Sequence, residues 1–62
     1  MATAHIHEKE RHNGTFWKLC APGASLPFAD RKTFNTAIAQ VRKFYPAAAI
    51  KVFPLNGEPY EV

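Results

Sequence analysis

The stretch TFNTAIAQVRKFY, residues 33–45, decides the fold that we predict for this chain. Its apolar residues recur at the spacing of an α-helix and form one stripe, made by Phe34, Ala37, Ile38, Val41, Phe44 and Tyr45. Asp30 or Thr33 can cap this helix, and we favour Thr33 because the stripe begins at Phe34; Pro46 ends the helix. One amphipathic helix needs an apolar surface to cover, so the flanking segments are expected to form a sheet.

The segment before the helix predicts two paired strands. In TAHIHEKER, residues 3–11, the odd-numbered side chains point to one face of a strand and the even-numbered ones to the other. His12, Asn13 and Gly14 predict a tight turn, because Asn-Gly readily adopts the positive φ angles of a hairpin. In the second strand, residues 15–21, Trp17 and Leu19 share one face, opposite Phe16, Lys18 and Cys20.

The remaining segments predict shorter strands. Pro22-Gly23 indicates a turn, and residues 25–28 are expected to form a short edge strand limited by Pro27. Residues 50–55 predict another strand with Ile50 and Val52 toward the helix, and Asn56-Gly57 indicates a second hairpin into residues 58–62. The predicted fold class is α+β: one domain, residues 1–62, with a single helix on one face of a small, mainly antiparallel sheet.

Length allows only a small core. A chain of 62 residues buries roughly 60% of the surface that it exposes when unfolded. With 47% hydrophobic residues, however, it is too apolar to be disordered by composition. We therefore expect a marginally stable domain, for which forming a homodimer would add buried area.

The charge is concentrated in the middle of the chain. The whole sequence carries a formal charge of +3, with a pI near 9.4. Between residues 11 and 57 there are seven basic residues and one acid, Asp30, while the other acids lie near the two ends. A basic centre suits an anionic partner, either nucleic acid or an acidic protein surface. Alternatively, the lysines only keep the protein dispersed.

The strongest functional prediction concerns the sheet face that the helix leaves uncovered. If the helix covers Ile6, Leu19 and Val52, the opposite face combines aromatic rings with cations. We predict this binding face to consist of His5, His7, Lys9, Arg11, Phe16, Lys18, Lys51 and Phe53. A surface that combines rings with cations is typical of proteins that bind single-stranded nucleic acid, because rings stack on bases and cations neutralise phosphates. Phe16 and Phe53 are the expected stacking residues.

Two other interpretations of these aromatic residues stay open. Phe16 and Phe53 could form a second small core beneath the loop of residues 21–30. Alternatively, the face could be a protein-interaction or inhibitor surface or a homodimer interface, where exposed aromatic residues are equally favoured.

Metal binding and cofactor binding are not expected. His5 and His7 project together from one strand, but a metal site needs one or two further ligands, and His12 lies beyond the turn. Solvent-facing imidazoles are the ordinary interpretation of this pair. Cys20 is the one cysteine, so an internal disulfide is excluded, and we interpret it as a small apolar strand residue rather than a reactive thiol.

No sequence motif indicates an enzyme. The chain has no Gly-x-Ser-x-Gly elbow, Walker motif or dinucleotide fingerprint, and three glycines cannot build a phosphate-cradling loop. With one helix, a helix-turn-helix is excluded as well. The absence of a signal-like or membrane-spanning apolar run leads us to expect a cytoplasmic protein without membrane contact. We predict a small non-enzymatic binding module, of a kind that suits a bacterial or phage-encoded accessory protein.

Overall fold

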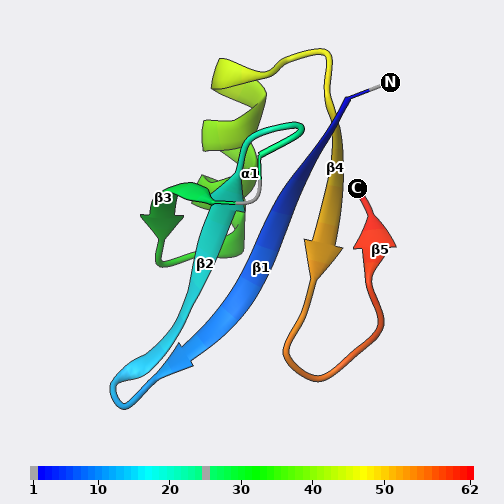
Figure 1. Ribbon diagram of the computed structural model, residues 1–62. Helices are drawn as coiled ribbons and strands as arrows, with labels where there is room; N and C mark the ends of the chain where they lie inside the picture. Colours follow the sequence, from blue (N-terminus) through cyan, green and yellow to red (C-terminus); the bar gives the residue numbers. More distant parts are fainter. Residues whose placement is uncertain (1, 25) are drawn as a thin grey trace.

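The computed structural model describes residues 2–24 and 26–62, which form five strands and one helix (Figure 1). The elements are β1 Thr3–Arg11, β2 Gly14–Cys20, β3 Pro27–Arg31, α1 Phe34–Phe44, β4 Ala49–Phe53 and β5 Tyr60–Glu61. The predicted α+β class is confirmed, with a single helix placed between the third and fourth strands.

The strands form one mixed sheet in the order β3-β2-β1-β4-β5. β1 lies at its centre, antiparallel to β2 and parallel to β4, while the outer pairs β2/β3 and β4/β5 are antiparallel. The parallel pair arises because α1 carries the chain behind the sheet, from one edge to the far side of β1 (Figure 1). A crossover helix is the usual way to connect parallel strands.

The β1/β2 hairpin turns one residue earlier than the Asn-Gly motif suggests. Arg11 pairs with Gly14, so His12 and Asn13 form the loop and Gly14 already belongs to β2. Gly14 has a φ of 132°, whereas no described residue other than glycine has a positive φ. The turn therefore depends on glycine alone and not on a left-handed asparagine.

The third strand differs most from its prediction. It covers Pro27–Arg31 instead of residues 25–28, and position 25 lies outside the described residues. Pro27 is the first residue of this edge strand, a position where a missing N–H is tolerated. A register shift beside Leu19 and Cys20 leaves Phe28 as an extra residue, and its ring contacts Phe44 and Tyr45.

The helix begins as predicted and ends one residue early. The side-chain oxygen of Thr33 accepts a hydrogen bond from the backbone N–H of Thr36, 3.3 Å away, so Thr33 rather than Asp30 is the N-cap. Asp30 belongs to β3. Phe44 is 53% exposed. Each residue turns the helix by about 100°, so Phe44 lies roughly 80° around the helix axis from Phe34, at the margin of the apolar stripe.

The core lies between the helix and one face of the sheet. Its fully buried side chains come from both, and they are Ala4, Ile6, Leu19, Ala37, Val41, Ile50 and Val52. Trp17 packs against this cluster and meets the ring of Phe34, with 5.0 Å between ring centroids. The predicted facing of Trp17 and Leu19 toward the helix is thus confirmed.

The last two strands are shorter than predicted, Ala49–Phe53 and Tyr60–Glu61. They are joined by residues 54–59 and not by a two-residue Asn-Gly turn, because Pro54 and Pro59 cannot donate ladder hydrogen bonds. The Glu8 carboxylate reaches this connection from β1 and accepts a hydrogen bond from the backbone N–H of Leu55 at 3.1 Å.

Two leucines provide a matched test of this core. Leu19 is fully buried, whereas Leu26 is 77% exposed. We expect Leu19→Ala to lower the free energy of unfolding by about 2–5 kcal/mol, a large share of the stability of so small a domain, because it leaves a cavity. Leu26→Ala should change it by less than about 0.5 kcal/mol. Urea unfolding followed by circular dichroism measures both; equal unfolding midpoints would contradict the described core.

Candidate functional site

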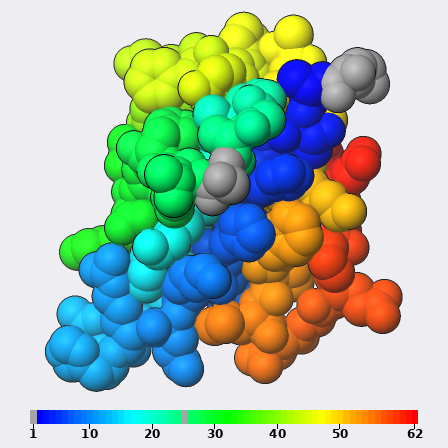
Figure 2. Space-filling view, viewed as in Figure 1, coloured from blue at the N-terminus to red at the C-terminus, as the bar shows by residue number. Residues whose placement is uncertain are grey.

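The uncovered face of the sheet gathers all eight residues that the sequence predicts for it. Cross-strand partners share a face, and the register pairs His5 with Cys20 and Lys51, His7 with Lys18 and Phe53, and Lys9 with Phe16. Arg11 continues the same alternation at the end of β1. Figure 2 shows this face, with β1 in blue running between β2 in cyan and β4 in orange. We call it the open face.

Three rings form a cluster where β1 meets β4. His7 and Phe53 are stacked, with their centroids 4.5 Å apart and their planes 6° from parallel. His5 meets Phe53 edge-on at 5.6 Å, and the Lys51 ammonium lies 5.6 Å from the centre of the Phe53 ring. All four side chains are partly exposed, so this ring cluster presents aromatic surface and positive charge together.

A second cluster lies near the β1/β2 turn. The Arg11 guanidinium lies over the Phe16 ring, 3.7 Å from its centroid, and the Lys18 ammonium is 5.9 Å from the same centroid. Phe16 is only 9% exposed as a result. Arg11 also donates a hydrogen bond to the Asp30 carboxylate at 3.3 Å, in an exposed ion pair. Phe16 therefore supports a cation and does not offer its own ring to a base, which corrects its expected stacking role.

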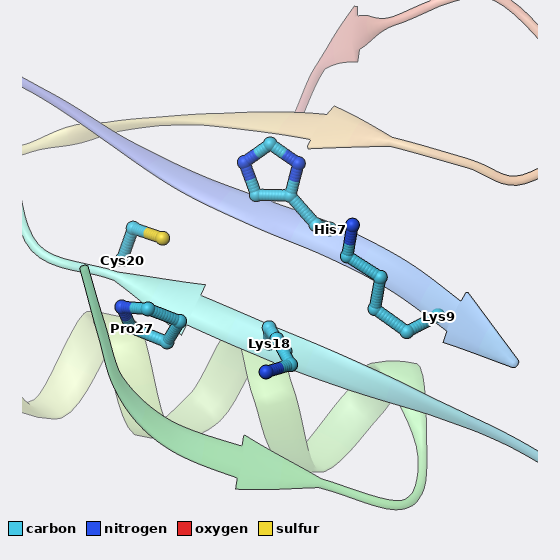
Figure 3. Close-up of a pocket in the computed structure, with 5 residues that line it drawn as sticks. All are labelled: His7, Lys9, Lys18, Cys20 and Pro27. Carbon is cyan, nitrogen blue, oxygen red and sulfur yellow. The ribbon is translucent and has the colours of Figure 1, made fainter. Parts of the chain in front are cut away.

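Between the two clusters the open face is hollowed. The hollow has a volume of about 280 Å³ and is lined by His7, Lys9, Lys18, Cys20 and Pro27. In Figure 3 the Lys9 side chain bends back along β1 toward His7, and the Lys18 side chain ends on the β3 side of β2. The thiol of Cys20 forms part of the wall and is itself buried.

Positive charge dominates this face. Within the described strands β1, β2 and β4, the open face carries Lys9, Arg11, Lys18 and Lys51 and no carboxylate. The acidic residues of β1, Glu8 and Glu10, belong to the opposite face. Acids reach the open face only on the outer strands, where Asp30 pairs in register with Lys18 and Glu61 with Lys51.

The imidazole of His7 responds to these surroundings. Partial burial lowers its pKa below the ordinary value of 6.5, and the positive charges of Lys9 and His5 lower it further. His7 is therefore neutral near pH 7, and its protonation at lower pH adds charge to a face that is already cationic.

Sequence reasoning missed the contributions of β3. Pro27 lines the hollow and Asp30 pairs with Arg11, but neither was expected at the site. Alternation of side chains along residues 27–31 is the signal that could have predicted Asp30 on the open face. The register shift at Phe28 interrupts this alternation. The alternative of a second core containing Phe16 and Phe53 is not what the structure shows, because these rings belong to separate clusters.

Neither a metal-binding cluster nor a membrane-spanning helix is found among the described residues. No group of three or more histidine, cysteine, aspartate or glutamate side chains is placed to hold a metal ion in residues 2–24 and 26–62. In the same part of the chain, no helix is long and apolar enough to cross a membrane.

Comparisons of the chain with protein-family models, with curated proteins and with solved structures gave no significant match. The function must therefore be argued from the geometry of the open face.

The pKa of His7 predicts a pH-dependent stability. Since the folded protein resists protonation of His7 while the unfolded chain does not, the unfolded state binds more protons once the pH falls below about 6.5. The free energy of unfolding should then decrease from about pH 7.5 to about pH 5, and His7→Gln should weaken this decrease. Urea unfolding across this range measures it, with His12→Gln in the hairpin loop as the control. An identical pH profile for His7→Gln and the unmodified protein would contradict the prediction.

Proposed function

We propose that this protein is a non-enzymatic binding module that holds single-stranded nucleic acid on the open face of its sheet. The observation that carries the proposal is the separation of side chains on β1: cations and imidazoles project to the open face, and carboxylates project to the other. A polyanion approaching the open face therefore meets Lys9, Arg11, Lys18 and Lys51 together.

The charge on this face favours an extended anion. Lys9, Lys18 and Lys51 form no salt bridge among the described residues, and the one ion pair there, between Arg11 and Asp30, is exposed and 3.3 Å long. A phosphate backbone crossing the strands can contact these cations without displacing strong internal partners. Each such contact releases counterions, which provides much of the affinity of nucleic-acid binding.

The rings favour single strands over duplexes. The Phe53 and His7 rings stand together on the open face, and a splayed base can extend their stack. The Arg11 guanidinium offers a second flat surface, supported from below by Phe16. Bases in a duplex are already stacked on each other and cannot use either surface, whereas unpaired bases can.

Salt dependence tests the electrostatic part of this proposal. Binding of a fluorescent twelve-residue thymidine oligonucleotide, followed by anisotropy, should weaken steeply with added salt. Lys18→Met should reduce the steepness of the logarithmic salt dependence by about 0.7, the expected loss of one contact to a single strand. Lys43→Met, which removes an exposed lysine from the helix, is the matched control and should leave it unchanged. Binding that does not respond to salt would contradict the proposal.

Stacking is tested by two phenylalanine variants. Phe53→Leu removes the ring from the open face and should weaken oligonucleotide binding about 5- to 150-fold, because stacking contributes ~1–3 kcal/mol per base. Phe44→Leu removes an exposed ring of the helix and should have little effect. The same titration with duplex DNA should show weaker binding. Equal affinity for duplex and single strand would overturn the proposed function. A stable dimer in sedimentation experiments that Phe53→Leu dissociates would overturn it as well, because the dimer would bury Phe53.

A further inference from the structure

The hollow between the two clusters is the part of the open face best shaped for one small anion. Its lining combines Lys9, Lys18 and His7, and none of its lining residues is acidic. The remaining lining, Cys20 and Pro27, is apolar. A hollow lined by two lysines and a histidine suits a tetrahedral oxyanion, because its oxygens accept hydrogen bonds from such donors.

We propose that this hollow is a phosphate-binding subsite, in which Lys9 and Lys18 hold the phosphate oxygens and His7 supplies a third donor when it is protonated. The inference deepens the proposed function, on which it depends for the biological ligand, because it assigns one phosphate group a defined place beside the ring cluster. His7 takes part in both features, since its ring stacks on Phe53 and also lines the hollow.

The arrangement of charge supports this assignment. Lys9 and His7 lie on the same face of β1, two residues apart, and Lys18 pairs in register with His7 on β2. Partial burial opposes protonation of His7, the positive charges of Lys9 and His5 oppose it further, and both lower the pKa of His7. An anion in the hollow would reverse this effect, because it favours the imidazolium. By linkage, the affinity for a phosphodiester, whose own charge stays constant, then increases as the pH falls.

Several other charged groups lie near His7 and also affect its titration, so the test must distinguish them from the hollow. His5 and Lys9 flank it on β1, Lys18 faces it from β2, and Lys51 lies beside Phe53 on β4. The carboxylates on this face are those of Asp30 on β3 and Glu61 on β5. Asp30 lies in register with Lys18 but forms its ion pair with Arg11, and Glu61 lies in register with Lys51.

The decisive experiment is an NMR pH titration of the His7 ring with two small phosphates. Dimethyl phosphate represents the backbone phosphodiester and keeps one negative charge throughout, whereas methyl phosphate represents a chain-end phosphomonoester. Relative to sodium chloride at equal ionic strength, we expect at least one ester to raise the pKa of His7 by about half a unit to one unit. The ester that acts identifies whether the subsite takes an internal or a terminal phosphate. The His12 resonance serves as an internal control and should not respond.

Lysine variants provide the specificity control. The double variant Lys9→Met, Lys18→Met keeps most of the length of both side chains and removes their charge, and it should lose the ester-dependent shift. Lys43→Met, on the exposed face of the helix, should retain it. Circular dichroism confirms that each variant is folded. A His7 titration that is the same in both esters and in chloride, or a shift that persists in the double variant, would overturn the subsite.

Oligonucleotide binding, measured in the same samples, separates this inference from the proposed function. Salt-dependent binding of the thymidine oligonucleotide without a His7 response to the esters would overturn the subsite and leave the proposed function supported. A His7 response to an ester without oligonucleotide binding would support the subsite and overturn the proposed function.

Discussion

The pairing of β1 with a strand on each side is the constraint on which the rest of the structure depends. β1 is hydrogen-bonded to β2 and to β4, so its two-residue alternation is imposed on both neighbours. Ile6 lies in register with Leu19 and Val52, and all three are fully buried. If the pairing of β1 slipped by one residue, His5 or His7 would take the place of Ile6 in the core. The burial of the core therefore also determines which residues form the open face.

A single short helix can cover only one face of this sheet, and the open face is stabilised in another way. Its side chains pack against each other sideways: the Arg11 guanidinium covers Phe16, and His7 stacks on Phe53. Cations and polar rings thereby protect aromatic carbon from water, although residues 2–24 and 26–62 place no second layer above them. The resulting surface combines positive charge with partly exposed rings, which are the properties that the proposed binding of a polyanion needs.

The distribution of charge on the open face has a cost for folding. Placing Lys9, Lys18 and Lys51 on one face creates repulsion that a protein selected for stability alone would avoid by mixing signs. The carboxylates of β1 are instead on the opposite face, where Glu8 bonds to the backbone of Leu55. Local arrangements that oppose stability are typical of functional sites, so the segregation itself supports a binding role for the open face.

The sequence by itself determined the helix, the Thr33 cap and the faces of β1 and β2, because these follow from local periodicity and from hydrogen bonds between near neighbours. The same alternation was sufficient to name the eight side chains of the open face. Tertiary structure decided what these side chains do to each other. Three of these interactions depend on contacts between strands: Arg11 covers Phe16, Asp30 pairs with Arg11, and His7 stacks on Phe53.

The third strand shows the same division most clearly. Its bounds and its register shift at Phe28 depend on contacts with the helix end and with β2, which no periodicity within residues 27–31 can reveal. The hollow beside Cys20 and Pro27 exists only because this strand lies where it does. Local pattern determines which way a side chain points, whereas its neighbours are determined by segments distant in the chain, and a binding site consists of such neighbours.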